Sequence, residues 1–506
     1  MSVDSDPLAA FRRLLDTAAR QPDGGAVTLT DTLVGPARGA LLRRCAVPQD
    51  FDIALLRQIG ELDLAQAQAC YEQFAELSII QINDQSLSIH ERWRQPLWRW
   101  WQDDAQRAEF SALNERLVRW FAAMPASATG EDPAARRRMF HLLGCRPAEG
   151  MALFEAQFRE ARHRGRFSEC TLLLRLAREH EPLLHPRDRA RLSYQEGKLA
   201  SDLRRWSEAE TLLRAVADDA HADPRLRVNA RVRVGHALRQ RGQTEAALAW
   251  LEPMRDPVAA DPATAASGWR VLYELGEVYR DLGRADDAVQ TLQAALSTMV
   301  EKDEDFDRPG MLNALGTAQL KLRDSEAAVA SFGASLGLLQ SAGDALRGAS
   351  VLNNLALAQL ERCDWAAAES SLSASMKGKQ AAGDLAGQAT VWFNLSRTQT
   401  AQEHLADALQ SAERAAAVYG AVADSRGQAR AQLAVGRLLR RVGRMPDAAA
   451  LLAALVRDAT AAGDAATAQS AQSELELCAA QRTMPLWGWA LITVAAILVI
   501  LGMAAD

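Results

Sequence analysis

Residues 272–292 read LYELGEVYRDLGRADDAVQTL, and two small residues of this stretch, Gly276 and Ala288, return every forty residues along the second half of the chain. The first position is occupied by Gly276, Gly316, Ala356, Ser396 and Gly436. The second is occupied by Ala288, Ala328, Ala368, Ala408 and Ala448. A constant register of this kind predicts stacked, equivalent units rather than one globular fold.

Each repeating unit is expected to contain two amphipathic helices. Leu272 and Leu275 lie four and one residues before the first small position, and Leu292 lies four after the second, which is a one-sided helical stripe. Small residues are required where the two helices cross, because larger side chains would push the backbones beyond the roughly 8–10 Å of close helix packing. The tripeptide Ala-Gly-Asp at 342–344 and 382–384 predicts a left-handed glycine that ends one unit and an aspartate that begins the next.

Earlier parts of the chain continue this register at slightly altered spacings. The additional pairs are Gly235 with Ala247, Gly197 with Ala209 and, in a degenerate copy, Phe158 with Cys170. The fold expected for residues 151–482 is therefore an α-solenoid of about seven to eight helix pairs, in a chain that is mostly α-helical.

The order Leu272, Leu275-Gly276, Tyr279 and Ala288 resembles the tetratricopeptide repeat (TPR), in a longer form of about forty residues rather than 34. The resemblance implies a curved array of helix pairs that binds extended peptides or a partner helix on the face formed by the first helix of each pair. A partner protein or peptide is therefore expected.

Candidate partner-binding residues are the outward side chains around the first small position. They are Arg270, Tyr273, Glu277, Arg280, Asn313, Thr317, Asn353, Arg397, Arg437 and Arg440. Asn313 and Asn353 occupy equivalent positions, at which TPR proteins often use asparagine to hold the backbone of a ligand. The alternative is that these polar residues are only solvated, as most exposed polar residues are.

Residues 38–95 have a different pattern, which predicts a small winged-helix domain. Short helices are expected at 40–46, 52–62 and 64–78, followed by a β-hairpin in which Ile80 and Ile82 alternate with polar residues before a turn at 83–86. The third helix contains no arginine or lysine between residues 65 and 77 and carries two glutamates, which a polyanion would repel. Nucleic acid is therefore not an expected partner.

The runs LLRRCAVP at 41–48, Phe51-Asp52 and Ile89-His90-Glu91 resemble the winged-helix segment of the STAND signal-transduction ATPases. In that family this segment follows a nucleotide-binding domain and precedes helical repeats. No lysine of this chain lies in a GxxxxGK[ST] loop, so the ATPase domain is expected to be absent. His90 is accordingly expected to be structural rather than to contact a nucleotide.

Tryptophan and arginine are concentrated between residues 92 and 101. Trp98 and Trp101 are candidates for a partner-binding anchor, because tryptophan and arginine dominate binding hot spots. The alternative is that these tryptophans pack the winged helix against the helices that follow.

Residues 486–505 contain a single polar side chain, Thr493, and begin next to Trp487 and Trp489. A helix of this length spans about 30 Å, so a transmembrane helix is expected at 485–505. With one residue after it, this helix would be a single-pass tail anchor, with the N-terminal bulk of the protein in the cytoplasm.

Composition gives no sign of chemistry. The net charge of −6 is spread along the chain, and the six cysteines form no CxxC pair. His180 and His185 flank Pro182 and so do not form an HExxH pair, and no catalytic, cofactor-binding or metal-binding residues are expected.

The predicted domains are an N-terminal segment 1–37, the winged-helix-like domain 38–95, a helical connector 96–150, the repeat array 151–482 and the membrane helix 485–505. The function expected first is a non-enzymatic, tail-anchored membrane adaptor that binds a partner through its repeats, in signalling or assembly. A regulatory subunit of a split STAND-type switch, acting with a separate ATPase or effector, is the alternative. A membrane-tethered transcription regulator is the third.

Overall fold

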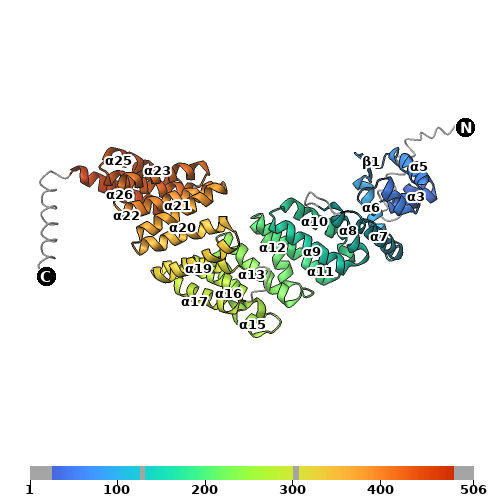
Figure 1. The fold of residues 1–506 in the computed structure, drawn as a ribbon, viewed down its shortest axis with the longest axis horizontal. Coiled ribbons are helices and arrows are strands. Elements are labelled where there is room, and N and C mark those ends of the chain that lie inside the picture. Colours follow the sequence, from blue (N-terminus) through green and yellow to red (C-terminus); the bar gives the residue numbers. More distant parts are fainter. Residues whose placement is uncertain (1–24, 126–131, 300–306, 484–506) are drawn as a thin grey trace. The chain divides into compact units, whose positions relative to one another are not determined.

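The computed structural model describes residues 25–125, 132–299 and 307–483 and divides the chain into two compact units (Figure 1). Unit 1 is Met1–Gln243 and unit 2 is Thr244–Asp506. The described residues are almost entirely helical, with one two-stranded sheet among them. The division at residue 243 falls inside the predicted repeat array, and the boundaries expected at residues 38, 96 and 151 stay predictions.

The first part of unit 1 contains short helices and a hairpin. They are α2 (Gly25–Val34), α3 (Pro36–Arg44), α4 (Ile53–Gly60), α5 (Leu64–Ala75), β1 (Ile80–Asn83), β2 (Ser86–Ile89), α6 (Glu91–Gln102), α7 (Arg107–Ala122) and α8 (Pro133–Cys145). Three helices and the hairpin lie where the sequence predicts them, and α2 was not expected. Asp52 and Asp63 begin α4 and α5 by accepting backbone N–H groups, as N-cap residues do.

The hairpin is antiparallel and buries one strand more than the other. Ile80 pairs with Ile89 and Ile82 with Leu87, while Phe51 adds a β-bridge to Leu87. Leu87 and Ile89 are buried, whereas Ile82 is exposed. His90 follows directly and accepts the backbone N–H of Arg92 at 3.3 Å, so it caps α6. This capping role agrees with the structural role expected for His90.

The second part of unit 1 consists of paired helices. They are α9 (Pro147–His163), α10 (Phe167–Glu179), the 3₁₀ turn η1 (Glu181–Leu183), α11 (Pro186–Asp202), α12 (Trp206–Asp218) and α13 (Pro224–Gln240). Phe158 and Cys170, from the degenerate repeat, are both buried in this part. One hydrophobic cluster runs from Leu29 in α2 to Leu199 in α11, so the small N-terminal elements and the first repeats share a core.

Unit 2 begins irregularly and then becomes strictly periodic. Its elements are α14 (Thr244–Leu251), η2 (Glu252–Met254), α15 (Arg255–Ala260), η3 (Ala265–Ser267), α16 (Gly268–Asp281), α17 (Ala285–Thr298), α18 (Arg308–Lys321), α19 (Ser325–Ser341), α20 (Ala345–Glu361), α21 (Trp365–Ala381), α22 (Leu385–Ala401), α23 (Leu405–Ala421), α24 (Ser425–Arg441), α25 (Met445–Ala461) and α26 (Ala465–Thr483). From α16 onward each helix packs against the next (Figure 1). First helices of successive pairs also meet, as α18 meets α20 and α24 meets α26.

Contacts between the two helices of each pair explain why small residues recur at two positions, here called the first and second small columns. A Cβ atom added to Gly276 would lie 2.6 Å from Leu292 Cγ, and one added to Gly436 would lie 2.6 Å from Leu452 Cδ2. Ala288 and Ala448, from the second column, are fully buried. The helix pairs and the reason for their small residues are therefore confirmed.

The turns between pairs also follow the expected chemistry. Gly343 has φ 71°, a left-handed conformation that favours glycine, and ends α19. Asp344 then accepts the backbone N–H of Arg347 at 3.0 Å and begins α20. Asp384 and Asp424 cap α22 and α24 in the same way.

The fold prediction was wrong in one respect, the C-terminal transmembrane helix. Across 25–125, 132–299 and 307–483, no helix combines the length and the apolar character needed to cross a membrane. The last of them, α26, carries Glu474 and Glu476. The span expected at 485–505 lies outside the described residues. The fold of the described chain is accordingly a helical solenoid without a membrane helix, and the single-pass, tail-anchored location is withdrawn with that helix.

Candidate partner-binding surface

The candidates on α16 are mostly engaged inside unit 2. Glu277 is buried and forms an ion pair with Arg280 at 2.6 Å. The guanidinium of Arg270 lies 4.7 Å from the ring centroid of Trp269. Tyr273 is half-buried and packs against a small hydrophobic cluster that contains Trp269. The ion pair and the cation–π contact therefore lie within α16 itself.

The candidate asparagines lie on neighbouring first helices and bond to other asparagines. Asn313 on α18 accepts an N–H from Asn354 on α20 at 3.0 Å. Asn353 on α20 accepts one from Asn394 on α22 at 2.9 Å. Thr317 donates its hydroxyl to the Asn313 carbonyl at 2.9 Å. The side-chain oxygens of Asn313 and Asn353 therefore already join adjacent repeats.

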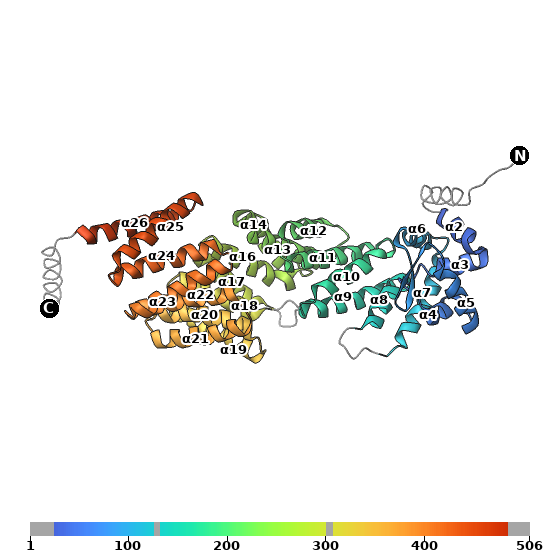
Figure 2. The same cartoon turned by 90° about the horizontal axis from the view of Figure 1, so that it is seen from above.

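The remaining three candidates, Arg397, Arg437 and Arg440, come together in a groove of about 840 Å³. It is formed mainly by α20, α22, α24 and α26, the orange to red first helices at the C-terminal end of unit 2 (Figure 2). We call it the arginine groove. Its charged and larger apolar lining residues are Arg323, Glu361, Arg397, Arg430, Arg437, Arg440, Arg441, Glu474, Leu360, Trp365, Phe393 and Leu438.

The carboxylates of the groove are held by only some of its arginines. Glu474 accepts ion pairs from Arg437 at 2.9 Å and from Arg440 at 3.2 Å. Arg323 pairs with Glu361 at 3.2 Å. The guanidinium of Arg441 pairs with Glu403, outside the lining.

Arg397 and Arg430 have a different environment. The Arg430 guanidinium lies 5.2 Å from the ring centroid of Phe393, a cation–π distance. Partial desolvation lowers the pKa of Arg397, and the positive charge of Arg430 lowers it further, against the opposite effect of Glu361. Both side chains are nevertheless exposed, so two cations lie near each other at the surface of the groove, an arrangement that favours an anionic ligand.

Sequence reasoning missed Arg430, Phe393 and Glu474. A signal for Arg430 was present, because residues 430, 437 and 441 are spaced by seven and four positions and so lie on one side of a helix. No local pattern signalled Glu474, which lies on the following first helix.

Trp98 and Trp101 lie in the core of unit 1, at 2% and 1% exposure. Trp98 packs edge-on against Phe110 at 5.5 Å between ring centroids. Trp101 donates its indole N–H to the Arg43 carbonyl at 2.8 Å. The packing alternative describes both residues, and neither offers a surface to a partner in this structure.

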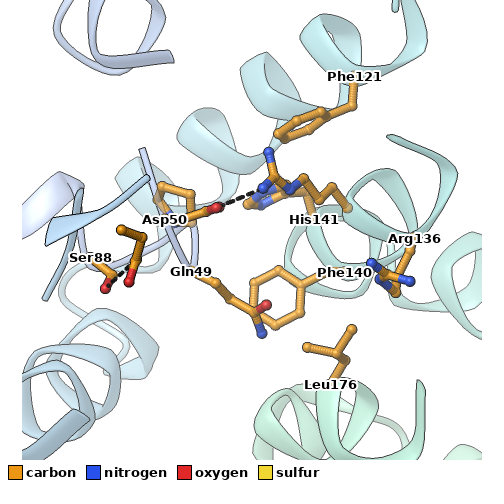
Figure 3. Close-up of a pocket in the computed structure, with 11 residues that line it drawn as sticks. Gln49, Asp50, Ser88, Phe121, Arg136, Phe140, His141 and Leu176 are labelled. Atoms are coloured by element: carbon orange, nitrogen blue, oxygen red, sulfur yellow. Dashed lines mark hydrogen bonds and ion pairs between the residues drawn. The ribbon is translucent and has the colours of Figure 1, made fainter. Parts of the chain in front are cut away.

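A smaller pocket of about 260 Å³ lies in unit 1 beside the hairpin (Figure 3). Asp50 and Arg137, both in its lining, form an ion pair at 2.7 Å. His141 bonds to Asn114 at 2.8 Å through Nδ1, and burial lowers the pKa of His141 to about 3, with added repulsion from Arg137 and Arg94. Such a histidine stays neutral and does not act as a base near neutral pH.

Among residues 25–125, 132–299 and 307–483, no cluster of three His, Cys, Asp or Glu side chains is placed to hold a metal ion.

Similarity to known proteins is found both in sequence and in structure. Residues 270–298 match the family model described as Tetratricopeptide repeat. No curated protein matches the chain.

Several solved structures are similar. One is a STAND protein with a tetratricopeptide repeat sensor from Pyrococcus horikoshii, with 14% identity and a TM-score of 0.53, covering 94% of this chain and 66% of that one. Another is a Rap protein complexed with competence and sporulation factor, at 12% identity and TM-score 0.45, covering 66% and 99%. A third is a tetratricopeptide repeat protein from Parabacteroides merdae, at 15% identity and TM-score 0.40, covering 56% and 98%.

The chain spans slightly less than two thirds of the length of the STAND protein, so that protein's activity is not carried over. Repeats of this class typically form non-enzymatic interaction scaffolds. Residues 270–298 are a tetratricopeptide repeat, and the helix pairs around them form a TPR-like solenoid.

Proposed function

We propose that this protein is a non-enzymatic scaffold that binds a partner protein or peptide through the TPR-like repeats of unit 2. The observation that carries the proposal is the arginine groove, because it unites Arg397, Arg437 and Arg440 from two first helices in one hollow. Concave sites with a few convergent charged groups are the usual places of ligand binding. The fully buried small residues of these helix pairs, Ala408 and Ala448, keep the paired helices close together. The groove is therefore formed before a ligand binds.

Site-specific photo-crosslinking tests this proposal. Ala401 is exposed and lines the groove, whereas Ala421 is exposed at the end of α23 and does not line it. A photoreactive amino acid at Ala401 of the full chain should crosslink a defined partner in cells of the source organism, and the same group at Ala421 should not. Equal crosslinking from both positions, or none from Ala401, would contradict a partner in this groove.

A second candidate function is a regulatory subunit of a split STAND-type switch. The similarity to a STAND protein over 94% of this chain favours it. In this proposal a separate ATPase polypeptide acts together with this chain. The repeats sense the signal that regulates the ATPase. The purified chain should then change the ATP turnover of that polypeptide at a one-to-one ratio. Unchanged turnover, with the two proteins failing to associate, would exclude it. Trp98 and Trp101 are unsuitable as test positions because they are core residues.

A further inference from the structure

The arginine groove has a large excess of positive charge. Its lining contains six arginines and two glutamates, Glu361 and Glu474, although the whole chain carries a net charge of −6. An accumulation of like charge in a hollow is unfavourable by itself, because each cation raises the free energy of its neighbours. The groove therefore favours a ligand that supplies negative charge.

Among the residues that the structure describes, two arginines of the groove have no acidic partner. Within the described part of the chain, no carboxylate lies within ion-pair distance of Arg397 or Arg430, while the other four arginines have one. Glu474 shows that arginines of this groove bind a carboxylate, because its side chain forms ion pairs with both Arg437 and Arg440. Arginine is well suited to this role because its planar guanidinium presents several donors to a carboxylate.

Apolar side chains lie beside these cations. Trp365 is 39% exposed and lines the groove together with Leu360 and Phe393. Exposed tryptophan is a frequent anchor for a partner's apolar side chain. The site is therefore amphipathic, with a cationic part and an apolar part.

From these observations we infer that the arginine groove binds an acidic peptide segment, in which at least two aspartates or glutamates flank a large apolar residue. Arg397 and Arg430 receive the carboxylates, and Trp365 with Leu360 contacts the apolar side chain. This inference rests on the proposed scaffold function and names the class of its ligand.

Fluorescence anisotropy with the full chain tests the inference. The probe is a labelled twelve-residue peptide with four glutamates around two leucines, and the control peptide has glutamine at the four positions. The acidic peptide should bind, and its affinity should fall as NaCl is raised from about 50 to about 300 mM, because salt screens exposed charges. Equal binding of the glutamine peptide would overturn the inference.

Variants separate the groove from general electrostatics. Arg397→Gln with Arg430→Gln should weaken binding at least about tenfold, since charge-assisted bonds are lost. Arg457→Gln removes an exposed arginine of α25 outside the groove and should change affinity by less than about twofold. Arg397→Lys with Arg430→Lys should recover part of the loss. Equal affinity of the wild type and the double glutamine variant, when circular dichroism shows both folded, would overturn the inference.

Binding of another kind of polyanion would contradict the acidic peptide as ligand. A single-stranded RNA of twelve nucleotides or a phosphorylated peptide that binds more tightly than the acidic peptide, and is lost in the same double variant, would replace the proposed ligand class. Crosslinking from Ala401 that persists in the presence of excess acidic peptide would refute the acidic ligand while leaving the scaffold function intact.

Discussion

Asn394 on α22 donates an amide hydrogen to Oδ1 of Asn353 on α20 at 2.9 Å, across forty-one residues of sequence. Asn354 makes the corresponding bond to Asn313 at 3.0 Å, also forty-one residues away. Neighbouring first helices are thus joined by amide pairs as well as by apolar contacts. Asn353 and Asn394 are both buried, so their bond has little competition from water.

Replacing Asn353 by alanine should therefore reduce stability. Asn394 would keep a buried amide without its acceptor, which costs about 1–3 kcal/mol in the free energy of unfolding. Urea denaturation monitored by circular dichroism measures this loss. The double variant Asn353→Ala, Asn394→Ala should lose less than the sum of the single variants, and strict additivity would contradict the pairing.

A second prediction concerns Gly316, which belongs to the first small column. A Cβ atom at Gly316 would lie 2.7 Å from Phe332 Cε1, so Gly316→Ala should cost about 1–3 kcal/mol through overpacking. Thermal unfolding of the full chain measures the effect.

Two comparisons identify the cause of that loss. Gly333 on α19 has no atom within 4 Å of an added Cβ, so Gly333→Ala should instead stabilise the helix by about 0.5–1 kcal/mol. Gly316→Ala should be tolerated better together with Phe332→Leu, because the next repeat naturally combines Ala356 with Leu372. If Gly316→Ala and Gly333→Ala behave alike, the packing explanation is wrong.

Acid should destabilise unit 1 through His141. Burial holds the pKa of His141 at about 3 in the folded chain, whereas the ordinary value is 6.5. Between these values the unfolded chain binds a proton that the folded chain does not, so stability falls as pH falls from 6.5 towards 3. Lowering the pH from 6.5 to 5 should reduce the free energy of unfolding by about 1.6 kcal/mol through His141 alone. Urea titrations at the two pH values measure this difference in the free energy of unfolding. The control is His90→Gln, at an exposed position, which should leave the difference unchanged.

His180 allows a stabilising substitution. It is fully buried among Trp98, Phe110 and Phe140. Neither of its ring nitrogens has a hydrogen-bond partner among the described residues. Burial lowers the pKa of His180 well below its ordinary value, with repulsion from His141 and Arg94 adding to the effect.

His180→Phe should therefore keep the packing, remove an unsatisfied polar group and match or exceed wild-type stability at pH 7. It should also weaken the pH dependence of the free energy of unfolding, because one proton fewer is taken up on unfolding. His141→Phe, which deprives Asn114 of its partner, should destabilise instead. An unchanged pH dependence in His180→Phe would contradict this account.

The contact between Trp98 and Glu179 links α6 to the end of α10. The indole N–H donates to the Glu179 carbonyl at 3.0 Å, and Arg94 pairs with the Glu179 carboxylate at 2.7 Å. Gln102 Nε2 also donates to the Glu179 carbonyl, at 2.8 Å, so Trp98→Phe removes one of two donors along with part of a buried ring. It should lower the free energy of unfolding by about 1–3 kcal/mol. Crosslinking from Ala401 should be unchanged. Normal stability with loss of the partner would restore Trp98 as a binding residue.

The forty-residue register was sufficient to predict the helix pairs because each pair is closed by local contacts. Gly276 meets Leu292 sixteen residues later, so the requirement for a small residue is repeated in every copy and is visible in the sequence. Likewise, Asp344 caps its own helix three residues on, and the signal is again local.

The candidate site was predictable only in part. Arg397 and Arg437 are one repeat apart and could be selected by phase, but Phe393, Arg430 and Glu474 follow no common phase and were missed. Trp98 shows the opposite error, since a residue typical of binding hot spots lies in the core.

The sequence by itself determined that the repeats consist of helix pairs and which faces of those helices pack, because these features depend on neighbours within about one repeat. Only the tertiary structure decided which arginines keep a carboxylate partner. Glu474 neutralises Arg437 and Arg440 from the next first helix, while Arg397 and Arg430 are left with none in the described chain. Ion pairing depends on distances between side chains of different helices, and those distances exist only once the repeats are stacked.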